Sequence, residues 1–340
     1  MKEILFQFGL TGDYWLNARP FGNGLINSTW MVESKSGSGP KYILQRMNTE
    51  VFKQPEDILY NIRFIGSYLE KNFPDYLFTI PCKSIWGDDF VTWGGECYYR
   101  MFPFIENSHT VDVVEKPQQA YEAAKQFGKF TKLLSAVDAY KLKITLPDFH
   151  NLTLRYQQFE NALETGNKER IEQSKDLIEV VKQNRTIVDQ YEHCKKDLKI
   201  RCTHHDTKIS NVLFDQAGKG LCVIDLDTVM PGYFISDVGD MIRTYLCPVS
   251  EEEKDYSKIM VRKEFYEAIV NGYLSEMGGE LSEKEQQYFH YAGFFMIYMQ
   301  AIRFLTDHLN DDAYYDAKYE GHNFVRAGNQ IILLQQLQLL

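Results

Sequence analysis

Short apolar runs separated by turn residues occupy the first hundred residues and predict β-strands. Residues 18–22 and 25–34 flank Asn23-Gly24, a pair that readily adopts the positive φ angles of a tight turn, so this segment predicts a β-hairpin. After a glycine- and serine-rich turn, residues 42–47 predict a third strand. The N-terminal part is therefore expected to form a small sheet.

One helix interrupts these strands. Residues 55–71 begin with a proline suited to the first turn of a helix and carry apolar side chains at three- and four-residue steps. The apolar positions on the predicted inner face are Ile58, Leu59, Ile62, Ile65 and Leu69. Residues 97–106 then predict a further strand that runs into a connection.

From about residue 112 the apolar spacing becomes helical, and it stays helical to the end except in one region. Residues 150–198 are polar and charged in a helical rhythm and predict two surface helices. Residues 199–245 instead contain short β-type runs between tight polar turns. These patterns predict an α+β, bilobal fold, with a small β-rich N-lobe at residues 1–106 and a larger, mainly helical C-lobe at residues 107–340.

Composition narrows the class of protein. The 340 residues are many for a single core, and a hydrophobic fraction of 44% allows substantial burial. The formal net charge of −10 argues against a nucleic-acid partner, which needs a basic surface. We expect no signal peptide, because the N-terminus lacks a basic region followed by a long apolar stretch, and no membrane span, because no apolar run approaches about 18 residues. The six cysteines form no C-x-x-C pair, which indicates a reduced, cytoplasmic protein.

Candidate catalytic residues concentrate in the segment THHDTKISNVLFD at residues 203–215. Asp206 follows a predicted strand, and Asn211 lies five residues later at the start of the next one. This spacing matches the protein-kinase loop H-R-D-x-x-x-x-N, in which the aspartate accepts the substrate hydroxyl proton and the asparagine binds a metal ion. Lys208 lies between them and is expected to meet a phosphate oxygen.

Two further carboxylates, Asp225 and Asp227, alternate in the run VIDLD. With Asn211 they form a set of hard oxygen ligands suited to Mg²⁺. A lone H-x-D is more often a capped turn, and a lone I-D-L-D is more often the end of a strand. The two motifs together, across one intervening strand, favour phosphoryl transfer over these structural alternatives.

These motifs resemble the aminoglycoside phosphotransferase and choline kinase family, which has a protein-kinase-like fold with an H-G-D-x-x-x-x-N loop and a following D-x-D. Within that family the chain is most similar to bacterial N-acetylhexosamine 1-kinases, over nearly its whole length. The shared segments are FGNGLINSTWMV, YILQRMNTEVF, THHDTKISNVLFD, VIDLDTVMPG, DVGDMIRTY, RFLTDHL and YYDAKYEGHNFVRAGNQI. The resemblance implies ATP- and Mg²⁺-dependent phosphorylation of the anomeric hydroxyl of N-acetylglucosamine or N-acetylgalactosamine.

The resemblance also implies roles for individual residues. Asp206 matches the catalytic base and Lys208 the phosphate-facing lysine. Asn211 and Asp225 match the metal ligands, and Asp227 matches the second acid of the D-x-D.

Four residues are expected to order the catalytic loop. Asp237, Asp240 and Arg243 of the shared segment DVGDMIRTY should brace the loop, and His204 should hold it in place without acting as a base.

The acceptor side is expected near the C-terminus. Arg303 resembles an arginine that holds the sugar, with Tyr314 nearby on the same wall, and both residue types suit sugars. A salt bridge from Arg303 to Asp307, four residues on, is the structural alternative. Tyr315 and Tyr319 are alternatives to Tyr314.

The nucleotide is expected between the lobes. Gly22 and Gly24 of the turn FGNGLIN would let the backbone approach the phosphates, although a plain hairpin is an equal alternative. Residues 99–106, which include Phe102 and Phe104, have the apolar strand-to-linker character of a kinase hinge.

This sequence departs from related patterns at three places. Where a protein kinase has a third-strand lysine, Gln45 and Arg46 are available, and Arg46 is the better electrostatic candidate for a phosphate contact. The sugar kinases tend to carry histidine where Leu25 stands and an aromatic residue near Thr244. Both positions are expected to face sugar or phosphate, so the identity of the acceptor stays open.

Two other functions compete with a sugar kinase. One keeps the fold and changes the acceptor to choline, homoserine, methylthioribose or an aminoglycoside; the acids Asp307, Asp311 and Asp312 would suit a cation, whereas Arg303 would repel it. The other is a nucleotide-binding pseudokinase, which the complete catalytic set disfavours. We expect a monomer that binds nucleotide and a small sugar and binds neither nucleic acid nor membrane.

Overall fold

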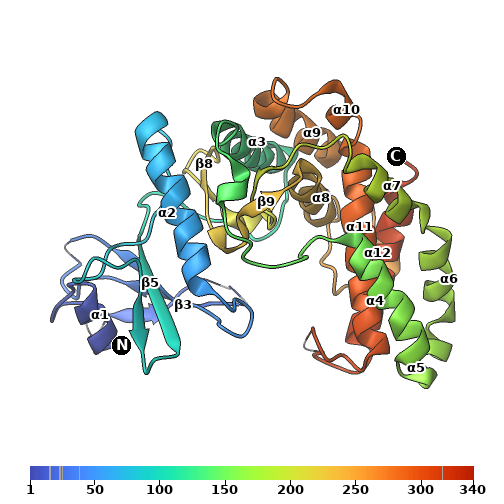
Figure 1. The fold of residues 1–340 in the computed structure, drawn as a ribbon, viewed down its shortest axis with the longest axis horizontal. Helices are drawn as coiled ribbons and strands as arrows, with labels where there is room; N and C mark the ends of the chain where they lie inside the picture. Colours follow the sequence, from blue (N-terminus) through green and yellow to red (C-terminus); the bar gives the residue numbers. More distant parts are fainter. Residues whose placement is uncertain (15–16, 23, 25, 38, 316) are drawn as a thin grey trace.

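A five-stranded antiparallel sheet forms the small lobe of the computed structural model, which describes residues 1–340 except 15, 16, 23, 25, 38 and 316. The strand order is β1-β2-β3-β5-β4, and β3 pairs with β5 along its whole length (Figure 1). The strands are β1 (Ala18–Pro20), β2 (Ser28–Val32), β3 (Tyr42–Arg46), β4 (Val91–Trp93) and β5 (Cys97–Pro103).

The two faces of this sheet have different partners, because successive side chains of a strand point to opposite sides. On one face, Leu44 and Met101 pack with Ile4 and Leu5 of helix α1 (Lys2–Gln7) in a small separate core. This core holds the outer face of the sheet without any contribution from the large lobe.

The other face of the sheet is turned toward the large lobe. It carries Gln45 and Arg100, which are register partners, and Phe102, which packs against the main core. Helix α2 (Pro55–Asn72) lies on this side (Figure 1) and buries the apolar positions predicted from its spacing in the same core. The inner face of the sheet therefore forms one wall of the space between the lobes.

Helix α11 (Phe289–Leu309) is the centre of the large lobe and is buried along most of its length. It packs against α12 (His322–Leu337), α8 (Phe234–Tyr245) and α4 (Leu152–Thr165). A Cβ atom at Gly239 would collide with the carbonyl oxygen of an α11 residue, so glycine permits the close approach of α8 to α11.

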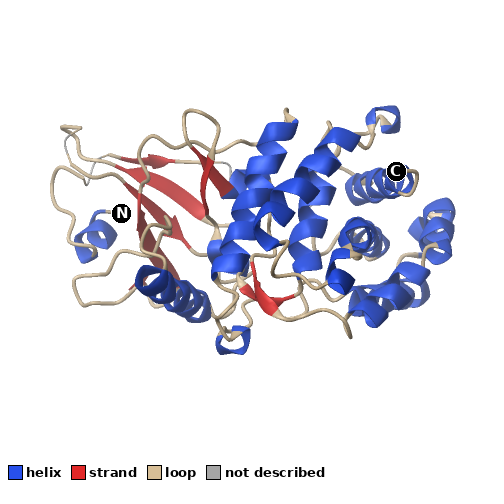
Figure 2. Ribbon diagram, turned by 90° about the horizontal axis from the view of Figure 1, so that it is seen from above, coloured by secondary structure: helices blue, strands red, loops and turns tan. Residues whose placement is uncertain are grey.

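The remaining helices surround this centre. Helices α3 (Pro117–Leu133) and α9 (Lys263–Met277) pack side by side between the sheet and the α11 group (Figure 2). The smaller helices are α5 (Lys168–Gln173), α6 (Lys175–Gln183), α7 (Thr186–Cys194) and α10 (Glu283–Gln286).

Two short antiparallel ribbons lie where the large lobe meets the sheet. β6 (Arg201–Thr203) pairs with β9 (Met230–Gly232), and β7 (Val212–Phe214) pairs with β8 (Gly220–Val223). Residues 204–211 connect the first ribbon to the second and contain the predicted catalytic loop. The turns η2 (Ile209–Asn211) and η3 (Leu226–Thr228) follow this loop and β8.

Several sequence predictions hold and several are wrong. The hairpin, the third strand, the helix at 55–71 and the strand from residue 97 are confirmed, and the expected lobe boundary at residue 106 falls between β5 and α3. Residues 150–198 form four helices instead of two, because turns at residues 166–167, 174 and 184–185 divide the polar stretch.

The hairpin loop and helix α8 also differ from the prediction. Residues 21–27 connect β1 to β2, so the turn is longer than an Asn-Gly pair, and Asn23 and Leu25 lie outside the described residues. Helix α8 was not predicted, because its polar residues are buried against the catalytic loop and hide the apolar periodicity. In the described part of the chain, no helix is both long and apolar enough to cross a membrane.

Candidate active site

Buried carboxylates hold the backbone of the catalytic loop. Asp237 on α8 accepts hydrogen bonds from the N–H groups of His204 (3.2 Å) and His205 (2.7 Å). Asp240, one turn later, accepts one from the N–H of Thr207 (2.8 Å) and pairs with Arg243 at 3.0 Å. The bracing expected for these residues is present in the structure. Because an unpaired buried N–H is costly, the two carboxylates restrict the loop to this conformation.

His204 orders the loop from inside. Its ring is fully buried. Because the carbonyl oxygen of Ile224 accepts from Nε2 at 3.0 Å, we place the proton of the neutral ring on Nε2. Its own carbonyl oxygen accepts from the hydroxyl of Thr228 (2.7 Å). Burial lowers the pKa of His204, so this residue stays neutral and ties the loop to the β8 end, as expected.

His205 occupies the position at which the family pattern has glycine. Its φ angle is +68°, in the left-handed region that glycine favours. Its ring packs against Gly232, where any Cβ atom would collide with the imidazole, and its Nδ1 lies 2.7 Å from the hydroxyl of Ser236. Burial lowers the pKa of His205 to about 3. The side chain is therefore a neutral part of the packing behind the loop.

Asp206 and Lys208, the predicted reactive residues, form an ion pair in the loop. The Nζ of Lys208 lies 3.1 Å from a carboxylate oxygen of Asp206. Burial opposes ionisation of Asp206, but the charge of Lys208 and the hydrogen bonds from Lys208 and Asn211 together hold its pKa below the usual value. Asp206 raises the pKa of Lys208 in turn. Both groups are charged at neutral pH, which suits an acceptor of a hydroxyl proton beside a phosphate-binding cation.

Asn211 and Asp225 both lie near Asp206. The amide Nδ2 of Asn211 donates to the Asp206 backbone oxygen (2.9 Å) and carboxylate (3.1 Å), so its Oδ1 is left as an acceptor. Asp225 follows β8 with a φ angle of +57° and is exposed. The surrounding protein keeps part of the water away from the carboxylate, and the negative charges of Asp227 and Asp206 lie nearby. Together these effects raise the pKa of Asp225 to about 7. A cation at Asp225 would relieve this concentration of negative charge.

Asp227 points elsewhere, because the left-handed turn at Asp225 breaks the strand alternation that the sequence suggested. Its carboxylate is 2% exposed and lies 2.5 Å from Nη1 of Arg100 on β5. The other oxygen accepts from Nδ2 of Asn27 (2.7 Å), in the loop between β1 and β2. These contacts occupy Asp227 and argue against its predicted role as a metal ligand.

The donor set that remains fits Mg²⁺. Among the described residues, no group of three or more His, Cys, Asp or Glu side chains is placed to hold a metal ion. Mg²⁺ is usually held in kinases by one or two protein carboxylates, with phosphate and water completing the shell. Asp225 and the Oδ1 of Asn211 supply such a partial set.

The residues predicted to bind nucleotide lie on the sheet side. Gly22 has a φ angle of +76°, which requires glycine, and Gly24 follows it in the same loop. Phe21 packs edge-on against Phe104 with ring centroids 6.2 Å apart, so this loop lies beside the predicted hinge. Arg46 is exposed and shares the outer face with Leu44, which argues against its predicted contact with the nucleotide.

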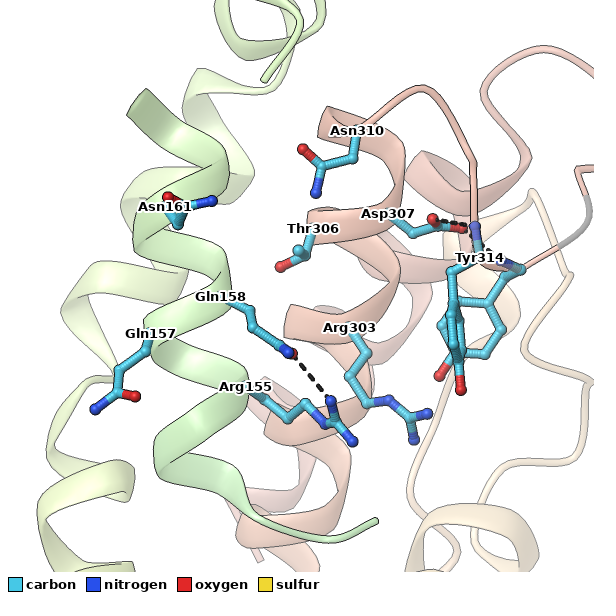
Figure 3. A pocket seen from close by; sticks show the side chains of 10 residues that line it. Arg155, Gln157, Gln158, Asn161, Arg303, Thr306, Asp307, Asn310 and Tyr314 are labelled. Carbon is cyan, nitrogen blue, oxygen red and sulfur yellow. Dashed lines mark hydrogen bonds between the residues drawn. The ribbon is translucent and has the colours of Figure 1, made fainter. Parts of the chain in front are cut away.

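A polar cavity of about 460 Å³ lies between α4 and the C-terminal end of α11 (Figure 3). Its lining residues are mostly uncharged and polar, with two guanidinium groups. They are Arg155, Gln157, Gln158, Asn161, Arg303, Thr306, Asp307, Asn310, Tyr314 and Tyr315. The predicted Arg303 and Tyr314 thus line one cavity, and the structure adds Arg155 to them.

The salt bridge considered for Arg303 does not form. In the described part of the chain, no carboxylate pairs with Arg303, whose Nη1 donates to the Gln300 side chain at 3.3 Å. Asp307 instead accepts from the N–H groups of Tyr314 and Tyr315, both at 2.8 Å. Tyr314 is 74% exposed, whereas Tyr315 is half-buried beside Arg303, so Tyr315 forms the fixed part of this wall.

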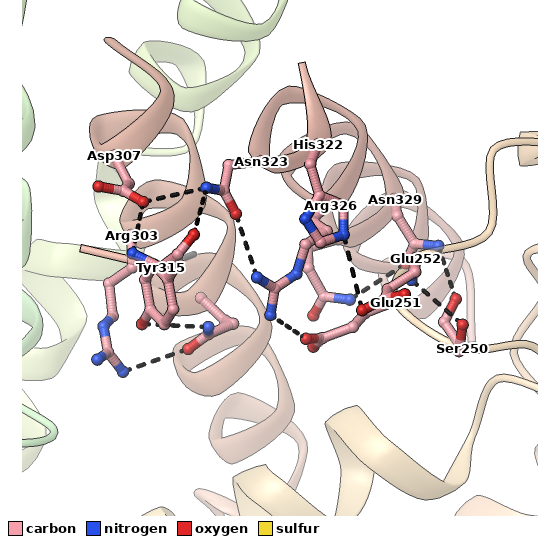
Figure 4. Close-up of polar contacts among 12 residues, drawn as sticks. Ser250, Glu251, Glu252, Arg303, Asp307, Tyr315, His322, Asn323, Arg326 and Asn329 are labelled. Atoms are coloured by element: carbon pink, nitrogen blue, oxygen red, sulfur yellow. Dashed lines mark hydrogen bonds and ion pairs between the residues drawn. The ribbon is translucent and has the colours of Figure 1, made fainter. Parts of the chain in front are cut away.

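A chain of charged contacts connects this wall to the catalytic loop, and Figure 4 shows the part of it between Arg326 and Glu251. Glu251 pairs with Arg243 at 2.7 Å and also with Arg326, whose guanidinium lies over the rings of Phe304 and Tyr315. Arg243 in turn holds the carboxylate that braces the loop. The wall that carries Arg303 and Tyr315 and the loop that carries Asp206 are therefore linked through one partly buried carboxylate, Glu251.

Two remaining predictions concern Thr244 and Leu25. The hydroxyl of Thr244 donates to the carbonyl oxygen of Asp240 within α8 (2.7 Å), so it is engaged by its own helix. Leu25 lies outside the described residues.

Sequence reasoning missed Arg100, Asn27 and Arg155. A signal existed for Arg100, because it is the single charged residue in the apolar strand CYYRMFP. The other two lie in polar surroundings, where one more polar residue carries little information.

Comparisons with known proteins agree with this geometry. A family model described as "Phosphotransferase enzyme family" matches residues 17–280. An amicoumacin kinase in complex with AMP-PNP, Ca²⁺ and Ami has a TM-score of 0.64 and 15% identity, covering 98% of this chain and 93% of that one. A microcompartment-associated aminopropanol kinase also has a TM-score of 0.64 and 15% identity, with coverages of 99% and 96%.

An ethanolamine kinase from Plasmodium vivax is similar at a TM-score of 0.58 and 14% identity, covering 97% of this chain and 86% of that one. At these identities the likeness concerns the fold. The predicted α+β, bilobal, protein-kinase-like architecture is confirmed.

Proposed function

The chain belongs to the phosphotransferase enzyme family, and we propose that it transfers the γ-phosphoryl group of ATP to the anomeric hydroxyl of an N-acetylhexosamine. The observation that carries the proposal is the ordered loop in which the Asp206 carboxylate, the Lys208 ammonium and the Asn211 amide face one space beside Asp225. A pseudokinase has no need to keep this set in working geometry.

Each residue has a distinct task in this reaction. The Asp206 carboxylate orients the acceptor hydroxyl and takes its proton as the bond to phosphorus forms. Lys208 meets the negative charge that spreads over the transferring group. When bound through Asn211 and Asp225, Mg²⁺ would supply further neutralisation of phosphate charge. The carboxylates of Asp237 and Asp240 keep the loop rigid, so little reorganisation accompanies transfer.

The cavity beside Arg303 supports a sugar as acceptor. Its amide and hydroxyl side chains match the many hydroxyl groups of a sugar, and about 460 Å³ is enough for one ring with its substituent. Arg155 and Arg303 make the cavity unfavourable for a cation. Of the acids that could have formed a cationic site, Asp311 and Asp312 pair with Arg170, and Asp307 is used by backbone N–H groups.

The test is a panel of acceptors with ATP and Mg²⁺. N-acetylglucosamine, N-acetylgalactosamine, glucose, choline, homoserine, methylthioribose and an aminoglycoside would be compared by kcat/KM, with phosphorus NMR of the product. We expect an anomeric phosphate from at least one N-acetylhexosamine. Turnover confined to the amines or to methylthioribose would reject the acceptor, and no phosphotransfer to any compound would reject the kinase.

A further inference from the structure

A buried arginine of the N-lobe, Arg100, pairs with the second carboxylate of the D-x-D. Arg100 on β5 is 1% exposed, and its Nη1 lies 2.5 Å from Asp227. Its Nε donates to the side-chain oxygen of Gln45 (3.0 Å), and its guanidinium lies over the ring of Phe102 at 5.2 Å. Its charge also opposes the rise in the pKa of Asp225, so it acts on both acids of the D-x-D.

The position of Arg100 is tied to that of the third strand. Gln45 and Arg100 are register partners on the face of the sheet that is turned toward the large lobe. Protein kinases place the phosphate-binding lysine on the third strand, whereas here the inward-facing residue of that strand is the neutral Gln45. Arg46 cannot supply the charge, because it lies on the outer face. The positive charge on the face of the sheet that is turned toward the large lobe is therefore on the neighbouring strand, at Arg100.

We propose that Arg100 is the phosphate-binding cation of the N-lobe and that Asp227 is its partner rather than a metal ligand. Gln45 orients the guanidinium through Nε, and Asp227 balances its charge at Nη1. Within the described part of the chain, no hydrogen bond or ion pair engages Nη2, so this nitrogen has donors for a phosphate oxygen. Guanidinium groups suit phosphate because their N–H donors lie in one plane.

Asp227 also connects this arginine to the loop that follows β1. Asn27 donates to Asp227 (2.7 Å) and accepts from the N–H of Asn48 (3.0 Å), the second residue after β3. The loop, the third strand and the fifth strand thus converge on one carboxylate of the large lobe. A nucleotide tail at Arg100 would meet a group held from both lobes.

The experiment measures nucleotide binding without any acceptor, so it is independent of the sugar proposed above. Binding of adenosine, ADP and ATP with Mg²⁺ would be compared by calorimetry for the wild type, Arg100→Met, Arg100→Lys and the matched control Arg46→Met. For Arg100→Met we expect Kd to rise about 10- to 100-fold for ADP and ATP and to change less than threefold for adenosine. Arg100→Lys should recover part of the loss, and Arg46→Met should bind like the wild type.

Two outcomes would overturn the role of Arg100. One is unchanged ATP affinity in Arg100→Met, and the other is an equal loss for adenosine and ATP, which would indicate a structural role. If Arg100→Met does not fold, Arg100→Lys decides: a loss for ATP and adenosine alike would reject the proposal, and a loss confined to the phosphorylated ligands would support it. A wild-type protein that binds no nucleotide would instead reject the proposed function.

Discussion

The catalytic loop and the acceptor wall lie in the same lobe, and in both of them a buried carboxylate accepts backbone N–H groups, but the wall presents a more exposed side chain. In the loop, the backbone N–H groups of His204, His205 and Thr207 all donate to buried carboxylates. In the wall, Tyr314 is 74% exposed and Arg303 has one long hydrogen bond among the described residues. The residues proposed to carry the chemistry therefore lie on a rigid support, while those proposed to select the acceptor include a side chain that faces water.

This difference has a physical basis. A group that takes a proton must be held within a fraction of an ångström, and buried charge-assisted hydrogen bonds supply such rigidity. A sugar brings its own hydroxyl groups and can be bound partly through water, so its site needs less burial. Substitutions in the two regions should consequently affect different kinetic constants.

The largest effect is expected at Asp206. In Asp206→Asn the side chain keeps its shape but cannot take a proton, so kcat should fall about 10²- to 10⁴-fold while Kd for ATP changes little. Steady-state kinetics and calorimetry measure the two quantities. Asp176→Asn, at an exposed position on α6, is the control and should retain full activity. A variant Asp206→Asn as active as the wild type would exclude Asp206 as the base.

An intermediate effect is expected at Arg303. Arg303→Met removes charged donors from the acceptor cavity, so KM for the acceptor should rise about 10- to 100-fold while kcat stays within a few-fold. The matched control is Arg185→Met, because Arg185 is exposed in the same lobe and pairs with Asp189 away from the cavity. A fall in kcat at constant KM would mean that Arg303 acts on the transferring group and not on the acceptor.

The smallest effect is expected for the pH dependence of stability, and it concerns His205, which packs behind the catalytic loop. Because burial lowers the pKa of His205 to about 3, this residue stays neutral in the fold while its unfolded form takes up a proton below about pH 6.5. The free energy of unfolding should therefore fall as pH decreases from 6.5 toward 3. His205 alone should contribute about 1 kcal/mol of loss between pH 7.5 and 5.5.

Urea unfolding at these two pH values tests this prediction. In His205→Asn, the new residue tolerates the left-handed backbone and does not titrate, so the difference between the two pH values should shrink by about 1 kcal/mol. His193→Asn, at an exposed position on α7, should leave the difference unchanged. Equal pH dependence in wild type and His205→Asn would contradict a neutral, buried His205.

Local patterns in the chain were sufficient for the fold class and for the catalytic loop. The spacing of Asp206 and Asn211 survives in the structure because both lie in one short connection whose length restricts where they point. The helix at 55–71 was predictable for a similar reason, since its apolar residues repeat within a few turns. Features that depend on residues close together in the sequence can therefore be predicted from the sequence alone.

The alternation of Asp225 and Asp227 predicted that both carboxylates bind the metal ion, and the backbone conformation at Asp225 argues against this for Asp227. A left-handed residue at Asp225 turns the chain, so Asp225 reaches the cleft while Asp227 is buried against Arg100. The preference for Arg46 over Gln45 failed because strand register decides which face a side chain occupies. A shift of the strand pairing by one residue would move every side chain of the strand to the opposite face of the sheet, and the sequence alone does not give the pairing.

The order of charged and apolar residues along this chain was enough to identify a two-lobed phosphotransferase and the loop that carries its chemistry, because those signals lie within a few residues of one another. Contacts between distant segments decided the rest: which arginine faces the D-x-D, which tyrosine is buried in the wall, and how Glu251 links that wall to the loop. Such contacts arise from packing of elements far apart in the chain, and packing depends on three-dimensional shape that local composition does not encode.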